Sequence, residues 1–138
     1  MEGALRNAGC RITRQRRAIL DCLTSTDTHP SARQVFQEAK KRCAGLSLAT
    51  VYNTLETLVK QGLIKIIDFE AMDNRLETNL KPHINLICNL CGKIEDFESC
   101  SPILSKNVTD QFGFEVQDYR MEYYGMCHSC RTQGRQNP

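Results

Sequence analysis

The stretch Ser47-Leu-Ala-Thr-Val-Tyr-Asn-Thr-Leu-Glu-Thr-Leu-Val-Lys-Gln-Gly62 decides the fold of the N-terminal half of the chain. Ser47 is a favourable helix N-cap, and Gly62 stands where a helix commonly ends. The apolar side chains between them recur at helical spacing, which predicts a helix with one buried stripe. That stripe consists of Val51, Leu55, Leu58 and Val59.

The other side of this predicted helix offers hydroxyl and amide groups with little charge in its first turns. A second predicted helix, capped by Ser31, precedes it, and a break around Gly45 separates the two. Two helices joined by a Gly-containing turn are typical of a helix-turn-helix, whose second helix enters the DNA major groove by its N-terminal residues. The polar residues at that end are Thr50, Tyr52 and Asn53.

A β-hairpin is predicted directly after Gly62. Residues 63–69 and 76–78 are expected to form its strands, and residues 72–75 the turn between them. Helices followed by such a hairpin make a winged helix, and Arg75 at the hairpin tip is a candidate phosphate contact. A winged helix that binds only protein has the same pattern, so the pattern alone leaves both uses open.

The first predicted helix of this half begins after Thr13, a favourable N-cap, and runs to about residue 23. Arg14, Arg16 and Arg17 cluster at its start. Cations at a helix N-terminus oppose the helix dipole, so an anionic partner explains them better than helix stability does. Solvated arginines are the alternative.

Charge is divided unevenly along the chain. Residues 1–65 hold eleven Lys and Arg against five Asp and Glu, whereas residues 66–138 hold seven against eleven. The overall net charge of +2 therefore conceals a basic half and an acidic half. Such asymmetry points to a nucleic-acid partner for the basic half, although basic helical surfaces also occur without one.

The second half is organised around residues 83–92, His-Ile-Asn-Leu-Ile-Cys-Asn-Leu-Cys-Gly, which contain one Cys-x-x-Cys pair. A second pair lies near the C-terminus, and two such pairs can hold one tetrahedral zinc ion through four thiolates. Redox dithiols are the alternative, but neither pair opens a helix after a strand in a βαβ pattern. The predicted zinc ligands are Cys88, Cys91, Cys127 and Cys130.

Strands at residues 83–87, 93–98 and 114–124, with a helix at residues 102–112, predict a small α/β module. The helix should be capped by Ser101 and begin at Pro102. We expect the strands to form an antiparallel sheet, and its unpaired edges favour dimerisation through the sheet.

The predicted fold class is α+β, in three segments. A winged helix-turn-helix domain spans residues 1–74, a hinge residues 75–82, and an α/β dimerisation and metal-binding domain residues 83–138. No apolar run approaches a membrane span and no signal-peptide core is present, which predicts a cytoplasmic protein without a membrane partner. Thiols stay reduced in that compartment, so the remaining cysteines are interpreted as packing residues. These are Cys10, Cys22, Cys43 and Cys100.

Over nearly its whole length the sequence resembles the ferric uptake regulator (Fur) superfamily. The resemblance is carried by Arg-Ile-Thr-Arg-Gln-Arg at residues 11–16, Leu-Ala-Thr-Val-Tyr-Asn-Thr-Leu at residues 48–55, and Cys-Asn-Leu-Cys-Gly-Lys-Ile-Glu-Asp-Phe at residues 88–97. It implies a homodimeric repressor that binds a palindromic operator in double-stranded DNA. By position, Tyr52, Asn53 and Thr50 would contact bases, and Arg14 and Arg16 would reach phosphates.

The resemblance also implies a regulatory metal in addition to the structural zinc. A shell of imidazole, carboxylate and carbonyl donors suits Fe²⁺, Mn²⁺ or Zn²⁺ better than a thiolate site would. Relatives usually have His where this chain has Asn85, and an amide oxygen is a weaker, neutral donor. The positions that match the regulatory ligands are His29, Glu77, His83, Asn85 and Asp96.

Two branches of the superfamily stay open. Asp96 resembles the peroxide-responsive (PerR) branch, in which iron(II) reacts with peroxide and ligand histidines are oxidised, whereas Glu77 resembles the regulators of iron or zinc uptake. A regulator of iron, zinc or manganese uptake is therefore the alternative. We take the PerR-type branch as the nearest, with Fe²⁺ or Mn²⁺ as the regulatory ion. The hypotheses of other classes are a thiol redox or zinc-dependent enzyme, and a zinc-stabilised interaction module without DNA. Four cysteines leave zinc no open position for catalysis, which argues against the enzyme.

Overall fold

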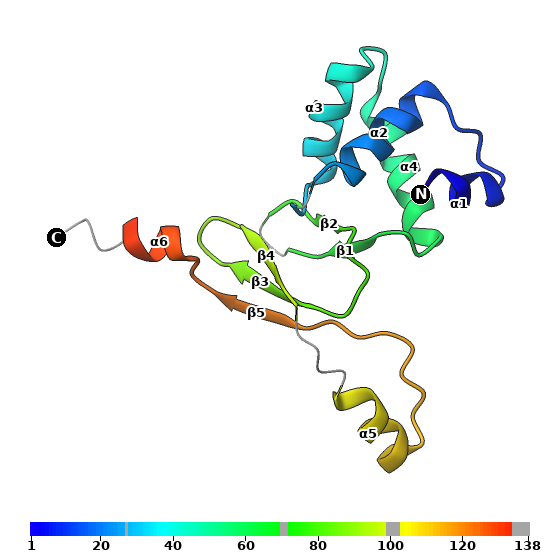
Figure 1. Cartoon of the computed structure of the whole chain (residues 1–138). Coiled ribbons are helices and arrows are strands. Elements are labelled where there is room, and N and C mark those ends of the chain that lie inside the picture. Colours follow the sequence, from blue (N-terminus) through cyan, green and yellow to red (C-terminus); the bar gives the residue numbers. More distant parts are fainter. Residues whose placement is uncertain (27, 70–71, 99–102, 134–138) are drawn as a thin grey trace. The chain divides into compact units, whose positions relative to one another are not determined.

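The computed structural model describes residues 1–26, 28–69, 72–98 and 103–133. The chain divides into two compact units, Met1–Leu80 and Lys81–Pro138 (Figure 1). The boundary falls within the stretch predicted as a hinge. Among the described residues, none of the helices is long and apolar enough to span a membrane.

The first unit is built mainly from helices, and three of them begin at the predicted caps. The hydroxyl groups of Thr13, Ser31 and Ser47 each accept a hydrogen bond from the backbone N–H three residues further on. Gly62 follows the last helix with a φ of 65°, the left-handed conformation that favours glycine at a helix end. The helices are α1 (Glu2–Asn7), α2 (Arg14–Thr24), α3 (Ala32–Arg42) and α4 (Leu48–Lys60).

These helices enclose one apolar core, to which α2, α3 and α4 each contribute buried side chains. Leu5 of the short α1 has no exposed surface and belongs to the same core. The N-terminal helix therefore helps to close this core. The large apolar side chains that the other helices bury fully are Ile19, Leu23, Val35, Val51 and Leu58.

A short hairpin follows α4 and forms the predicted wing. Its antiparallel strands are β1 (Lys65–Ile67) and β2 (Arg75–Glu77). On its other edge, β2 pairs with the segment that leads into α3: the Leu76 N–H donates to the Pro30 carbonyl at 2.9 Å, and Ser31 forms a β-bridge with Arg75. The winged helix is thus confirmed, with its wing fastened to the start of the helix-turn-helix.

The second unit contains a three-stranded sheet in the order β4-β3-β5. Strand β3 is antiparallel to β4 but parallel to β5, so the expectation of a purely antiparallel sheet was wrong. The connection through α5 returns the chain so that β5 runs alongside β3 in the same direction. The elements are β3 (Ile84–Cys88), β4 (Ile94–Phe97), α5 (Ile103–Phe112), β5 (Glu122–Gly125) and α6 (His128–Gln133).

The predicted strand at residues 114–124 was also wrong over most of its length, because β5 begins only at Glu122. Its pairing with β3 starts where the Asn85 N–H donates to the Met121 carbonyl at 3.0 Å, and residues 114–121 form no regular element. The predicted helix start at Ser101 and Pro102, and Cys100, lie outside the described residues. The α+β class with a winged helix and a small α/β unit is confirmed.

Candidate functional site

Four cysteine side chains meet at one end of the sheet in the second unit. Cys88 ends β3, Cys91 lies in the following turn, and the other two stand at the start of α6. The sulfurs of Cys88, Cys91, Cys127 and Cys130 all lie within 4.8 Å of one another, and those of Cys91 and Cys127 are 3.8 Å apart. Zn–S bonds of about 2.3 Å in a tetrahedron would place sulfurs about 3.8 Å apart. The cluster therefore fits one four-coordinate zinc ion.

Hydrogen bonds shift the pKa values of Cys88 and Cys130 in opposite directions. The Cys127 N–H donates to the Cys88 sulfur at 3.3 Å, and with the backbone amides of Cys91 and Leu90 it lowers the pKa of Cys88 to about 6. Hydrogen bonds to the Cys127 and Cys91 sulfurs raise the pKa of Cys130 to about 12. Without a cation, the clustered thiols cannot all ionise at neutral pH. A divalent cation resolves this conflict because it favours the thiolate of each ligand.

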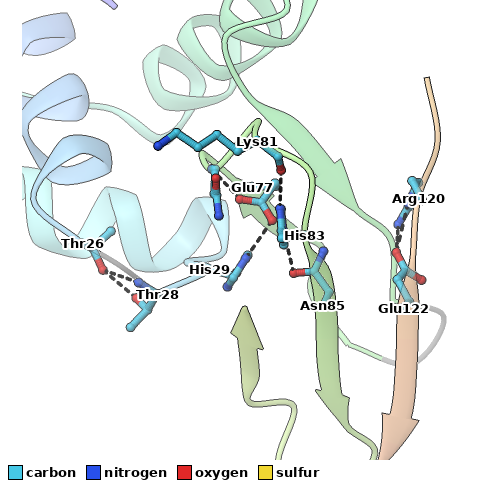
Figure 2. Close-up of polar contacts among 10 residues, drawn as sticks. Thr26, Thr28, His29, Glu77, Lys81, His83, Asn85, Arg120 and Glu122 are labelled. Carbon is cyan, nitrogen blue, oxygen red and sulfur yellow. Dashed lines mark hydrogen bonds and ion pairs between the residues drawn. The ribbon is translucent and has the colours of Figure 1, made fainter. Parts of the chain in front are cut away.

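His29 and Glu77 form a buried pair within the first unit (Figure 2). They adjoin Pro30 and Leu76, so the backbone bond between those two residues brings them together. His29 Nε2 lies 2.9 Å from one Glu77 carboxylate oxygen, and each side chain is only 5% exposed. The other Glu77 oxygen accepts a hydrogen bond from the Asn79 backbone N–H at 2.6 Å. The pair supplies one imidazole and one carboxylate, two of the donor types predicted for the regulatory metal.

Three more predicted ligands share one face of the sheet in the second unit. The register places Asn85 opposite Asp96, and His83 precedes Asn85 by two residues. His83 Nδ1 lies 2.7 Å from the Lys81 carbonyl oxygen, which can only accept, so Nδ1 carries the proton. The other ring nitrogen, Nε2, lies 3.3 Å from the Asn85 amide oxygen (Figure 2).

Sequence reasoning missed one carboxylate on this face. The parallel register places Glu122 of β5 opposite Asn85, so Asp96 and Glu122 flank Asn85 on the two neighbouring strands. The Glu122 carboxylate accepts hydrogen bonds from the Arg120 guanidinium at 2.6 and 3.0 Å. The alternation of side chains along a strand could have assigned Glu122 to one face of the sheet. That Glu122 lies beside Asn85, however, depends on the parallel pairing of β5 with β3, for which the sequence has no local signal.

The exposed start of α4 carries the predicted polar groups. Tyr52 is 51% exposed, Asn53 is also exposed, and the hydroxyl of the half-buried Thr50 lies 2.8 Å from the Ser47 hydroxyl. Leu48, at 36% exposure, adds an apolar side chain at the same end. Hydroxyl, amide and apolar groups at a helix N-terminus are the groups that read base edges in the major groove.

The three arginines predicted to reach phosphates have different surroundings. Arg14 is exposed, whereas Arg16 is half-buried and donates from Nη1 to the Arg11 carbonyl at 2.8 Å. A guanidinium has five N–H donors, so this bond leaves Arg16 others for a phosphate. Arg75 begins β2 instead of lying in the turn, and its guanidinium is 5.8 Å from the centre of the Phe69 ring.

The fold and the cysteine cluster together define a class: winged-helix proteins that carry a thiolate metal centre in a second unit. Residues 7–124 match the sequence profile of the Ferric uptake regulator family. The chain belongs to this family.

Relatives in the family are similar over most of this chain. The peroxide-responsive repressor PerR of Staphylococcus aureus (strain USA300) is 39% identical over 132 residues, which are 93% of this chain and 87% of that protein. The peroxide stress regulator of Campylobacter jejuni has a similar structure, with a TM-score of 0.73 and 30% identity over 84% of this chain and 88% of that one. A zinc-bound manganese uptake regulator gives a TM-score of 0.70 and 30% identity over 91% and 97% of the two chains.

The cysteine cluster predicts one tightly held zinc ion per chain. Cys91→Ser should lose this zinc and destabilise the second unit, because binding energy at a structural zinc site is folding energy. Elemental analysis after mild chelation, together with thermal unfolding, measures both effects. Cys10→Ser is the matched control, since Cys10 is half-buried outside the cluster, and it should keep its zinc. Full zinc occupancy in Cys91→Ser would contradict the four-cysteine assignment.

Proposed function

We propose that the chain is a metal-dependent, DNA-binding repressor of transcription whose regulatory metal responds to peroxide. The observation that carries the proposal is the buried His29–Glu77 pair, because it builds two metal donors into the same unit as helix α4. A metal that binds this pair acts directly on the DNA-binding unit. The similarity to a peroxide-responsive repressor and to a peroxide stress regulator supports the peroxide response.

Two metal ions with different roles are assigned. Zinc fills the closed four-cysteine site and stabilises the second unit, whereas a regulatory Fe²⁺ or Mn²⁺, for which Zn²⁺ is a possible substitute, takes nitrogen and oxygen donors. When bound, iron(II) supplies the redox chemistry by which peroxide oxidises a ligand imidazole. The proposed regulatory ligands are His29, Glu77, His83, Asn85 and Asp96.

The DNA contacts are assigned to the start of α4 and to nearby arginines. The Asn53 amide can pair with the N6 and N7 edge of an adenine, and the Tyr52 ring can pack against thymine methyl groups. Phosphate contacts from the arginines fix the orientation of the unit on the duplex but carry no sequence information. The proposed residues are Thr50, Tyr52 and Asn53 on bases, and Arg14, Arg16 and Arg75 on phosphates.

The repressor is proposed to act as a homodimer on a palindromic operator. A two-fold dimer presents two copies of α4 to successive major grooves, about 34 Å apart. Strands β4 and β5 are the edges of the sheet within each chain, and Phe97 and Tyr123 on them are more than half exposed. Unpaired edges with exposed aromatic side chains are suitable surfaces for a partner subunit.

A metal-uptake regulator is the second candidate function. Asn85 offers an amide oxygen where the family resemblance implies an imidazole, and oxygen donors favour a hard ion such as Mn²⁺. The similarity to a manganese uptake regulator agrees with this alternative. Members of the family are transcriptional regulators rather than enzymes, and a closed zinc site offers a substrate no coordination position.

Specific DNA binding is the first test. Protein loaded with zinc and Mn²⁺ should select a palindromic sequence from random DNA and bind it about a thousandfold or more tightly than random DNA at the same salt concentration. Tyr52→Ala should weaken specific binding by about 1–3 kcal/mol in equilibrium titrations. Gln37→Ala, exposed on α3, is the control and should bind like wild type. Equal affinity of the wild type for both DNAs would refute the repressor function.

Oxidation by peroxide separates the two candidate functions. Iron(II)-loaded protein exposed to peroxide should gain one oxygen atom on His29 or His83, measured by mass spectrometry of its peptides, and should release DNA. The Mn²⁺-loaded protein is the control for the metal, and the exposed His128 is the control for unspecific oxidation. Intact histidines, with DNA binding still tuned by metal, would instead identify a metal-uptake regulator.

A further inference from the structure

One side-chain hydrogen bond in the first unit joins the first turn of α2 to the turn before α4, thirty residues further along the chain. The Gln15 side-chain amide, in the first turn of α2, donates from Nε2 to the Gly45 carbonyl at 2.8 Å. Gly45 lies in the turn between α3 and α4, two residues before Ser47, whose hydroxyl caps α4. The bond therefore reaches the backbone that sets where α4 begins.

The first residues of both helices lie outside the core. In α2 the first buried residue is Ala18, so the turn that contains Gln15 lies outside the core. In α4, Leu48 and Ala49 are exposed and Val51 is the first buried residue. Closer to Gly45, Leu46 is 3% exposed and its N–H donates to the Cys43 carbonyl at 3.0 Å. Leu46, between Gly45 and Ser47, thus anchors the turn in the core and to the end of α3, and Gln15 adds a tie from the turn to α2.

This tie matters because the two helix starts have different tasks at DNA in the proposed function. Arg14 and Arg16 of α2 are assigned to phosphates, whereas Tyr52 and Asn53 of α4 are assigned to bases. Phosphate contacts position a protein on the duplex, and base contacts specify the sequence, so both must fit one duplex at the same time. The distance between the two helix starts then decides whether the base contacts come into register.

We infer that Gln15 is a positioning residue for sequence recognition, which holds the start of α4 at a fixed place relative to the phosphate-binding start of α2. This inference rests on the proposed DNA-binding function. The competing role is a direct contact, because glutamine amides also donate to phosphate oxygens. The two roles differ in what the loss of Gln15 does to random-sequence DNA.

The test uses the full chain loaded with zinc and Mn²⁺ and a palindrome selected from random DNA by the wild type. Gln15→Met keeps the length of the side chain but removes its donor. Its affinity for the palindrome should fall about three- to tenfold, the effect of one hydrogen bond. Affinity for random DNA and the slope of log affinity against log salt should not change. Amide exchange of residues 45–50 in the free protein should become faster. Gln37→Met, exposed on α3, is the matched control and should change none of these values.

Two results would overturn the inference. A parallel loss of affinity for both DNAs would make Gln15 a phosphate contact, because phosphate contacts carry no sequence information, and an unchanged affinity for the palindrome would leave it no role. If Gln15→Met does not fold, Gln15→Glu is used instead, because it also lacks the donor. The quantity compared with wild type is then the ratio of the affinity for the palindrome to the affinity for random DNA. An unchanged ratio overturns the inference. A wild type without preference for any sequence refutes the repressor function itself, which is a separate outcome.

Discussion

The backbone hydrogen bond from Leu76 to Pro30 is the constraint on which the proposed mechanism depends. It fastens the wing strand β2 to the segment that leads into α3, where Ser31 both caps the helix and bridges to the wing. His29 and Glu77 are the immediate neighbours of the bonded residues, so their contact follows from this pairing. A change at His29 or Glu77 therefore acts on the wing and on the start of α3, two parts of the helix-turn-helix unit.

The two candidate metal centres differ in how the chain prepares their donors. In the cysteine cluster, backbone amides favour the thiolate of Cys88, whereas the neighbouring sulfurs favour the protonated thiol of Cys130. A bound cation allows all four cysteines to be thiolates. At the regulatory positions the donors already have partners within the protein: His29 contacts Glu77, and His83 contacts the Lys81 carbonyl. A metal at these positions must replace or adjust such contacts, so we expect it to bind with a smaller net energy than zinc does at the four cysteines. The first centre suits permanent stabilisation and the second a replaceable, regulatory ion.

Local sequence signals predicted most of the first unit and the cysteine cluster. Helix starts at Thr13, Ser31 and Ser47 are recognisable because a capping hydroxyl acts within its own turn, and Cys-x-x-Cys spacing describes a ligand pair directly. Features that depend on distant pairing were missed: the parallel alignment of β5 with β3, the position of Glu122 beside Asn85, and the bond from Gln15 to Gly45. The buried role of Leu5 was missed as well, since a short helix with one apolar anchor has almost no periodicity to detect.

The most direct test of metal-controlled DNA binding is thermodynamic reciprocity. Mn²⁺ should raise the affinity of the zinc-loaded protein for its selected palindrome, by about 5- to 150-fold if the coupling is of typical size. The palindrome should raise the affinity of the protein for Mn²⁺ by the same factor. Random DNA at the same salt concentration is the control and should give a smaller factor. His29→Ala should remove the coupling in both directions while zinc stays bound. A palindrome that leaves Mn²⁺ affinity unchanged, or a His29→Ala variant with full coupling, would contradict the account.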